Sequence, residues 1–216
     1  SQEQLAHEQQ RRHDQTQLLS MLMHELKTPL SVIDMAVSTH SQDGRMAHFV
    51  NRAVDNIKGI LDRCIQTDRM VEREFRLQTQ QVFLSEQLIH WIQNRKEGAV
   101  KFQTEIAPDI HLQSDLQCIE IVVNNLIGNA LLHGDPQAPV KISLHKKLAE
   151  DGRAGVLLSI SNRPGPSGWP EPDKLFAKYY RSSGAHARTG SGLGLYLVAG
   201  LARMLGGEVR YRTDLP

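Results

Sequence analysis

The residues best suited to chemistry near the start of the chain form the string His-Glu-Leu-Lys-Thr-Pro-Leu, which begins at His24. His24 lies between Leu22 and Leu26, two apolar residues of one helical stripe, so its side chain is expected to point away from that stripe. An exposed imidazole nitrogen can attack a phosphorus centre, and a neighbouring carboxylate such as Glu25 can fix the tautomer or accept the proton. The spacing therefore places a nucleophile and an assisting group on one helix.

The same string can also be interpreted as a solvated surface histidine or compared with a zinc-binding motif. A lone histidine on a helix is more often a solvated surface residue than a catalytic one. A zinc site is not indicated, because Thr28 stands where a His-Glu-x-x-His motif has its second ligand. Pro29 lies inside the helix and frees the carbonyl of Glu25, so we expect a kink just after His24.

A second group of polar residues lies on a helix predicted over 115–132. Asn125, Asn129 and His133 are four residues apart and share one helix face. Amide oxygens on such a face can hold a hydrated Mg²⁺ and phosphate-bound water, although a solvated polar face is the simpler interpretation. The opposite, apolar face is expected to contain Ile119, Val122, Leu126 and Ala130.

A third group combines glycines with basic residues. Gly190, Gly192 and Gly194 stand just ahead of another predicted helix, where backbone N–H groups can approach phosphate oxygens. The run lacks the Lys-Ser/Thr of a P-loop, so the glycines alone indicate little. Upstream, Lys178 and Arg181 can neutralise phosphate charge, or can simply be solvated.

Taken together, these strings resemble four boxes of the sensor histidine kinases, in the family's order. The matching runs are the H-box at 24–30, the N-box at 124–133, the F-box at 175–181 and the G2 box at 189–195. The resemblance implies that His24 is phosphorylated, that Glu25 assists the transfer and that Thr28 positions water for dephosphorylating the partner. It also implies that Asn129 ligates Mg²⁺.

The same resemblance implies a function. The chain would use ATP and Mg²⁺ to phosphorylate its own His24 and would pass the phosphoryl group to an aspartate on a response regulator receiver domain. It would also act as a phosphatase, and residues 182–188 would form a lid over the nucleotide. The implied ATP-binding residues are Asn125, Asn129, His133, Asn162, Lys178, Arg181, Gly190, Gly192, Leu193 and Gly194.

Three positions depart from the family's pattern. The G1 box should read Asp-x-Gly-x-Gly, but Asn162 and Pro164 replace its aspartate and first glycine. Asn162 keeps an oxygen that can accept a bond from the adenine amine, and loss of the charge costs about 1 kcal/mol. Leu132 stands where the family usually has a basic residue. A further strand usually follows Thr213, so we expect a truncated or short variant.

The elements that position the first motif are two helices within residues 1–76. Apolar residues recur at helical spacing on both sides of a turn expected at Ser41–Gly44, and Gln2–Gln17 is expected to extend the first helix as a stalk. Two helices with one apolar stripe each cannot enclose a core. We therefore expect a homodimer in which two helical hairpins form a four-helix bundle.

Residues 77–216 are predicted to form an α+β sandwich, which by resemblance is the Bergerat or GHKL ATPase-like domain that binds ATP. Strands are expected over 82–84, 100–106, 140–148, 156–161 and 208–211, and helices over 85–95, 115–132 and 193–205. Ser114 or Asp115 is expected to cap the second of these helices. The run 163–172 is predicted to be a loop.

Composition limits the remaining possibilities. The net charge of +1 supplies no basic field for nucleic acid, and Cys64 and Cys118 lie too far apart for a metal knuckle and are expected to be free thiols. No apolar run is long enough to span a bilayer. The resemblance to sensor histidine kinases implies a cytoplasmic segment tethered to an upstream inner-membrane or sensor region. Two alternatives stay open: a degenerate kinase-like scaffold with weak ATP binding that acts as a dimeric docking or phosphatase module, and a repair or chaperone ATPase of the same nucleotide fold. The latter leaves the His24 string unexplained.

Overall fold

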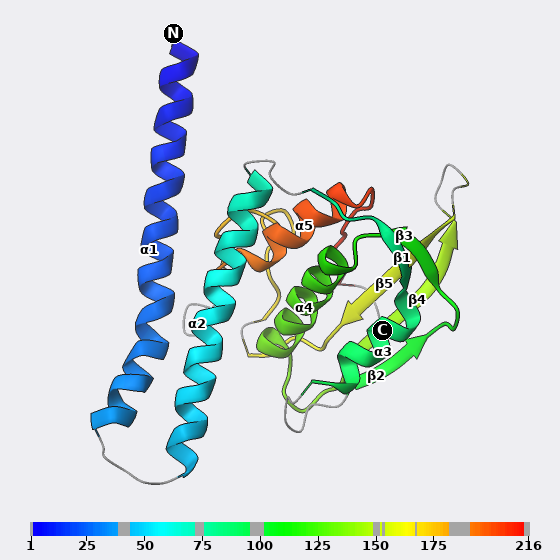
Figure 1. Ribbon diagram of the computed structural model, residues 1–216, viewed down its shortest axis with the longest axis horizontal. Coiled ribbons are helices and arrows are strands. Elements are labelled where there is room, and N and C mark those ends of the chain that lie inside the picture. The colour runs from blue at the N-terminus through cyan, green and yellow to red at the C-terminus, as the bar shows by residue number, and fades with distance from the viewer. Residues whose placement is uncertain are drawn as a thin grey trace.

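The chain begins with two antiparallel helices, followed by a domain of strands and helices (Figure 1). The computed structural model describes residues 2–38, 44–71, 76–95, 102–148, 152, 154–166, 168–181 and 191–213. The helices are α1 (Gln2–Ser38), α2 (Gly44–Val71), α3 (Leu84–Gln93), α4 (Leu116–His133) and α5 (Gly194–Met204). The strands are β1 (Gln80–Phe83), β2 (Phe102–Ile106), β3 (His111–Ser114), β4 (Val140–Leu148) and β5 (Ala154–Ser161).

We call α1 and α2 the helical hairpin. The predicted extension of the first helix over Gln2–Gln17 is confirmed, because α1 runs without interruption from Gln2 to Ser38. Pro29 lies inside this helix and its side chain is buried. The buried seam of α2 is formed by Ala53, Ile60 and Thr67, which are seven residues apart, the spacing of a heptad repeat. The turn expected at Ser41–Gly44 lies outside the described residues except for Gly44, which begins α2.

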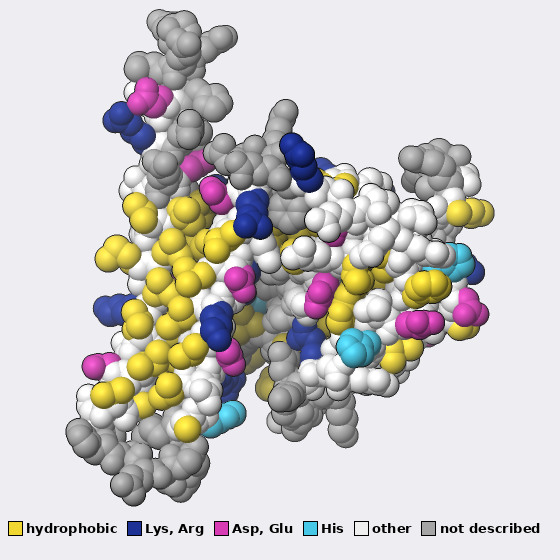
Figure 2. Space-filling model, in the orientation of Figure 1, with side chains coloured by type: hydrophobic (Ala, Val, Ile, Leu, Met, Phe, Trp, Pro, Cys, Tyr) yellow, Lys and Arg dark blue, Asp and Glu magenta, His cyan; other side chains and the backbone are white. Residues whose placement is uncertain are grey.

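The hairpin leaves much of its apolar surface uncovered. Leu19, Met23, Leu30 and Val37 follow one another on α1 at spacings of four and seven residues and are 53% to 76% exposed; we call them the apolar stripe. Phe49, Leu61 and Ile65 on α2 are also exposed. Figure 2 shows hydrophobic side chains gathered over both helices on the visible face of the hairpin. Such a surface is typical of a protein interface.

The part of the chain from β1 onward is called the C-terminal domain. Its larger sheet has the order β2-β4-β5, with β2 parallel and β5 antiparallel to β4; β1 and β3 form a separate antiparallel pair. Helices α4 and α5 lie between the sheet and the hairpin in Figure 1. The core is closed by completely buried residues of helices and strands, among them Leu88, Val123, Ile127, Ile142 and Leu144.

Helix α4 begins at the predicted cap. The Asp115 side chain accepts hydrogen bonds from the backbone amides of Cys118 at 2.9 Å and Gln78 at 2.7 Å. Burial opposes ionisation of this carboxyl, but these bonds outweigh that effect and lower its pKa. Asp115 thereby ties the segment that enters the C-terminal domain to the helix that carries the asparagine face.

Three expectations about this domain need correction. Residues 208–211 are described but form no strand; Glu208 and Arg210 instead pair with each other at 2.7 Å. Strand β3 was not expected, since its four residues become a strand only through pairing with β1.

The prediction of the apolar face of α4 was wrong in part. Ile119 and Ala130 are buried as expected, but Val122 and Leu126 are only half-buried, and the helix is also buried on the side of Cys118, Ile121, Val123 and Ile127. It packs against both the sheet and α5, so one apolar stripe does not describe it.

Candidate functional site

The H-box places an exposed histidine beside a buried carboxylate. The side chain of His24 is 69% exposed, as the stripe spacing predicts, whereas that of Glu25 is 2% exposed. His24 Nδ1 lies 3.6 Å from Glu25 Oε1. A proton on Nδ1 therefore faces the carboxylate, which leaves Nε2 as the ring nitrogen without that neighbour. Thr28 lies one turn further along α1 and is also exposed.

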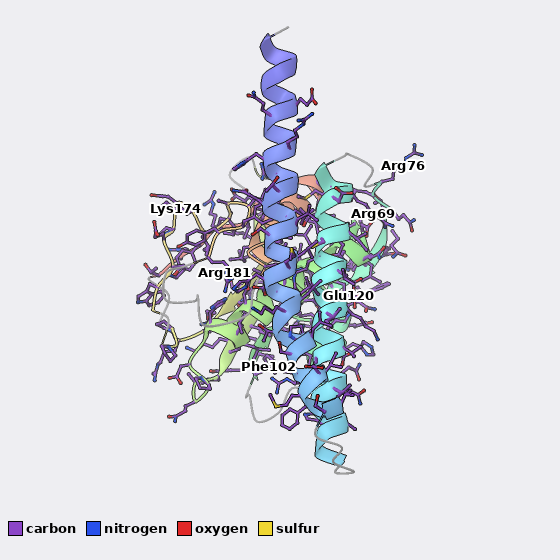
Figure 3. The ribbon with its side chains drawn as sticks, turned by 90° about the vertical axis from the view of Figure 1, so that its left-hand side faces the viewer. Arg69, Arg76, Phe102, Glu120, Lys174 and Arg181 are labelled. Atoms are coloured by element: carbon purple, nitrogen blue, oxygen red, sulfur yellow. The ribbon has the colours of Figure 1, made fainter. Side chains whose placement is uncertain are left out.

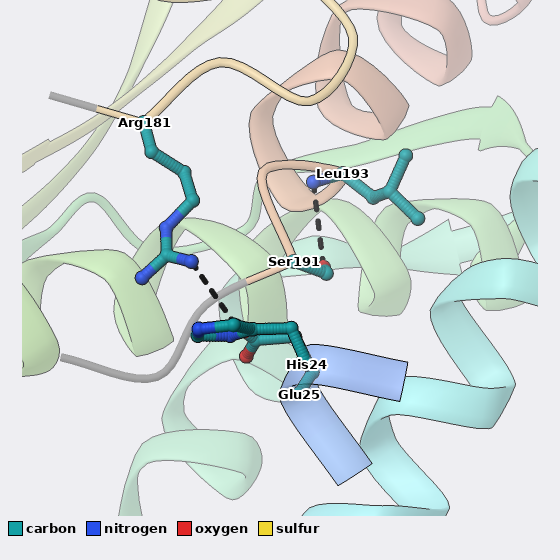
Figure 4. A network of polar contacts seen from close by, with 5 residues as sticks. All are labelled: His24, Glu25, Arg181, Ser191 and Leu193. Carbon is teal, nitrogen blue, oxygen red and sulfur yellow. Dashed lines mark hydrogen bonds and ion pairs between the residues drawn. The ribbon is translucent and has the colours of Figure 1, made fainter. Parts of the chain in front are cut away.

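The C-terminal domain reaches this pair through Arg181. Its Nη1 donates to Glu25 Oε1 at 3.3 Å, across 156 residues of sequence (Figure 4). In Figure 3, which looks onto the hairpin, Arg181 lies beside α1. The F-box segment and the H-box, predicted separately from sequence, therefore meet at Glu25.

A second arginine that sequence reasoning missed lies within the electrostatic range of Glu25. Arg63 on α2 is half-buried, and its Nη1 lies 3.5 Å from where a side chain on Gly59 would begin. Burial lowers the pKa of Arg63, and the negative charge of Glu25 opposes that shift. No sequence signal marks Arg63, because its proximity to Glu25 depends on the register between two helices.

The asparagine face of α4 lies against the start of α5. Asn125, Asn129 and His133 are each half-buried, and Asn125 Nδ2 donates to Ile121 O at 2.8 Å. A side chain on Gly194 would begin 3.0 Å from Asn125 Oδ1 and 3.8 Å from Asn129 Nδ2. Glycine at this position therefore keeps a narrow space open between the amides and the N-terminus of α5.

The altered G1 segment folds over the end of α4. Asn162 Nδ2 donates to Arg163 O at 3.0 Å, and Gly165 N donates to His133 O at 2.9 Å. Pro164 forms an isolated bridge with Gly134. Any side chain on Gly165 would begin 2.6 Å from Gly134 O, so this close approach requires glycine.

The G2 and F-boxes are joined through their backbones. Tyr179 N donates to Gly192 O at 3.0 Å, and both residues have positive φ, 64° each. Burial raises the pKa of Tyr179 to about 12, so its hydroxyl stays protonated at neutral pH. Lys178 Nζ lies 5.1 Å from the Tyr179 ring centroid, and Leu193 is completely buried. Gly190 and the lid expected at 182–188 lie outside the described residues.

These residues fit a magnesium nucleotide better than a metal held by protein alone. Within the described ranges no group of three or more His, Cys, Asp or Glu side chains could hold a metal ion. Mg²⁺ keeps several waters and is commonly bound by one or two protein oxygens plus substrate phosphates. The amide face, the space beside Gly194 and the N-terminus of α5 provide that kind of surface.

The sequence is similar to those of known ATPases and histidine kinases. A family described as histidine kinase-, DNA gyrase B- and HSP90-like ATPases matches residues 114–215. The sensor protein KdpD of Mycobacterium tuberculosis is 26% identical over 218 residues, which cover 92% of this chain and 24% of KdpD. The histidine-protein kinase AfsQ2 of Streptomyces coelicolor is 27% identical over 210 residues, covering 87% of this chain and 37% of the relative.

A solved structure has the same fold. The histidine kinase AdeS of Acinetobacter baumannii superposes with a TM-score of 0.64 at 19% identity, covering 88% of this chain and 91% of that one. The expected order of a helical region followed by an α+β sandwich of the GHKL ATPase type is thus confirmed. No helix among the described residues is both long and apolar enough to cross a membrane.

Proposed function

We propose that this chain, a member of the sensor histidine kinase family, uses ATP to phosphorylate its own His24 and passes the phosphoryl group to an aspartate of a response regulator receiver domain. The observation that carries the proposal is the meeting of Arg181 and Glu25 beside an exposed His24. The nucleotide-binding domain thereby contacts the residue next to the phosphate acceptor.

His24 and Glu25 have distinct parts in this chemistry. Glu25 holds the His24 ring in the tautomer that has its proton on Nδ1 and a free electron pair on Nε2, and it accepts the Nδ1 proton as the bond to phosphorus forms. Nε2 attacks the γ-phosphorus, the bond to the β–γ bridging oxygen breaks, and ADP leaves with that electron pair. Positioning and charge neutralisation supply most of the catalysis in such transfers.

The C-terminal domain would supply the phosphoryl donor. Asn129 would ligate Mg²⁺, which neutralises phosphate charge, and Asn125 and His133 would extend the same face. Asn162 would accept a bond from the adenine amine through Oδ1, because its Nδ2 already donates to Arg163 O. Lys178 and Arg181 would balance phosphate charge, and the glycines from Gly190 to Gly194 would admit the phosphates.

Reverse chemistry and assembly complete the proposal. Thr28, exposed one turn after His24, would position water for dephosphorylating the regulator. The apolar stripe would pair with a second copy to form a dimeric four-helix bundle, with residues 1–76 as the dimerisation and phosphotransfer domain and 77–216 as the ATP-binding domain. We place the chain on the cytoplasmic side, tethered to an upstream membrane or sensor region.

Labelling with [γ-³²P]ATP tests the central step. The unaltered chain should acquire acid-labile, base-stable label, and His24→Gln should acquire none. The matched control is His13→Gln, which removes another exposed histidine from α1 and should leave labelling unchanged. Equal labelling of the unaltered chain and His24→Gln would exclude the proposal.

Asn162 and Pro164 support a second candidate, a dimeric docking or phosphatase scaffold that binds ATP poorly. Calorimetry separates the two candidates, because absence of binding at millimolar ATP supports the scaffold. If the kinase proposal holds, Asn162→Asp should tighten ATP binding several-fold, since restoring the charge contributes about 1 kcal/mol.

A further inference from the structure

The backbone around Asn162 is fixed against the end of helix α4. The chain leaves β5 and crosses the end of that helix (Figure 1). There Asp135 N donates to Arg163 O at 2.9 Å, and Gly165 N donates to His133 O at 2.9 Å. On its other side Asn162 directly follows the last residue of β5, which is paired with β4. The backbone of Asn162 is therefore held from both directions, and its side chain is the part left to rotate.

The amide of Asn162 makes a hydrogen bond that it can give up. Its Nδ2 donates to Arg163 O at 3.0 Å, and this bond is exposed to solvent. Arg163 O also accepts from Asp135 N, so this carbonyl keeps a donor when the amide turns. Gly134 leaves room for the turn, because a side chain there would begin 3.1 Å from Asn162 Nδ2. The amide can therefore present either its oxygen or its nitrogen in the same direction.

Purine bases differ in the group that such an amide would meet. Adenine has a 6-amino group, which donates, whereas guanine and hypoxanthine have a 6-oxo group, which accepts. A carboxylate contains acceptors only, so it pairs with the 6-amino group and is repelled by the 6-oxo group. An asparagine amide matches both bases, with Oδ1 toward the 6-amino group or Nδ2 toward the 6-oxo group. An aspartate at position 162 would thus select against 6-oxopurines, and an asparagine does not.

We propose that Asn162 makes the nucleotide site accept 6-oxopurine nucleotides, the class that includes GTP, as well as ATP. The inference rests on the proposed function, because it requires the base to lie against Asn162. Turning the amide sacrifices only the exposed bond to Arg163 O. A 6-oxopurine nucleotide should therefore bind at most about tenfold more weakly than its adenine counterpart, equivalent to about 1.4 kcal/mol.

Calorimetry with the Mg²⁺ complexes of ADP and inosine diphosphate (IDP) tests this selectivity. Diphosphates have no γ-phosphoryl group to transfer, so binding is measured without turnover. IDP is the probe because hypoxanthine has the 6-oxo group of guanine but not its 2-amino group, whose size would add a separate effect. In the unaltered chain the dissociation constant of IDP should exceed that of ADP by about tenfold or less. A ratio of about 100 or more would overturn the proposal.

Two substitutions at position 162 should move this ratio in opposite directions. Asn162→Asp removes the donor and adds charge, so ADP should bind several-fold tighter, IDP more weakly, and the ratio should exceed about 100. Asn162→Ala removes both polar atoms, so both nucleotides should bind more weakly with a ratio of about 1. A ratio that Asn162→Asp leaves unchanged assigns base selectivity to other residues and excludes the proposal.

Asn94→Asp is the matched control. It makes the same change at an exposed residue that follows α3, and it should leave the ratio of the two dissociation constants unchanged. Binding of ADP by each variant at position 162 also shows that its nucleotide site is folded.

The outcomes separate this inference from the function on which it rests. If neither ADP nor IDP binds at millimolar concentration, the proposed nucleotide site fails and the inference fails with it. If ATP labels His24 but IDP binds about 100-fold more weakly than ADP, the kinase proposal stands and the inference is overturned. If the ratios are as expected but His24 is not labelled, the inference stands and the phosphoryl transfer is overturned.

Discussion

The helical hairpin and the C-terminal domain bury their apolar side chains in different ways. In the C-terminal domain, Leu88, Val123 and Leu144 are completely inaccessible to solvent, enclosed between helices and sheet. In the hairpin, Met23 and Val37 are 76% and 68% exposed. Burying surface of this kind contributes about 25 cal/mol per Å². The C-terminal domain therefore closes its own core, while the hairpin, which carries the proposed phosphate acceptor, keeps an apolar surface exposed until something covers it.

The largest expected effect comes from placing a charge on the apolar stripe. Leu30→Glu should dissociate a dimer, because an exposed leucine that becomes buried contributes about 1.5–3 kcal/mol and a two-fold interface contains it twice. The dissociation constant should rise at least about 100-fold. Sedimentation equilibrium measures this change. Ser31→Glu, next to the stripe on the same helix and exposed, is the control and should stay dimeric. A Leu30→Glu variant that remains dimeric at low micromolar concentration would show that the stripe faces something else.

A cavity in the C-terminal domain tests the other half of the comparison. Leu88→Ala should lower the free energy of unfolding of that domain by about 2–5 kcal/mol, because Leu88 is completely buried. Ile89→Ala, one residue away and 41% exposed, should cost less than about 1 kcal/mol. Differential scanning calorimetry should show only the transition of the C-terminal domain moving. A matching shift in the transition of the hairpin would mean that the two regions unfold as one unit.

Much of the fold could be predicted from local sequence patterns. The helices α1, α2, α4 and α5 follow from apolar periodicity, and Asp115 was recognised as a possible cap from its residue type and place. Strand β3 could not be found in this way, because His111–Ser114 has weak strand propensity and extends only by pairing with β1. The strand predicted over residues 208–211 is absent for the same reason, since residues with high strand propensity form no strand without a partner strand.

The candidate site could be predicted as separate motifs but not as one arrangement. The exposure of His24 followed from its place between Leu22 and Leu26. The meeting of Arg181 with Glu25 and the approach of Arg63 depend on how α1, α2 and the segment that carries Arg181 pack, so no local pattern contains them. The roles proposed for the nucleotide-binding residues stay predictions.

The cap of α4 should give a smaller effect with a particular pH dependence. Asp115→Ala should cost the C-terminal domain about 1–2 kcal/mol through loss of the bonds to Cys118 and Gln78, and Asp115→Asn less, because its amide oxygen still accepts. The folded-state pKa of Asp115 is lowered, so its ionised form stabilises the fold above the unfolded pKa of about 3.9. This contribution is lost as the pH falls through the folded pKa. Urea unfolding at several pH values should therefore show Asp115→Asn and the unaltered chain converging below about pH 4. A difference that stayed constant with pH would assign the effect to packing.

The smallest expected effect is at an ion pair on the stalk, where the bond is short but exposed. Arg12 Nη2 lies 2.8 Å from Glu8 Oε1, closer than Arg181 lies to Glu25, yet the two side chains are 77% and 62% exposed. Water and salt screen such a pair, so Glu8→Gln should change the stability of the hairpin by no more than about 0.5 kcal/mol, and by less at high salt. Thermal unfolding followed by circular dichroism at low and high ionic strength checks this. A loss above about 1 kcal/mol would mean that the stalk is packed against another surface in solution. If the change is as small as expected, burial and not the length of the bond distinguishes the stalk from the site at Glu25, where the carboxylate is almost completely removed from water.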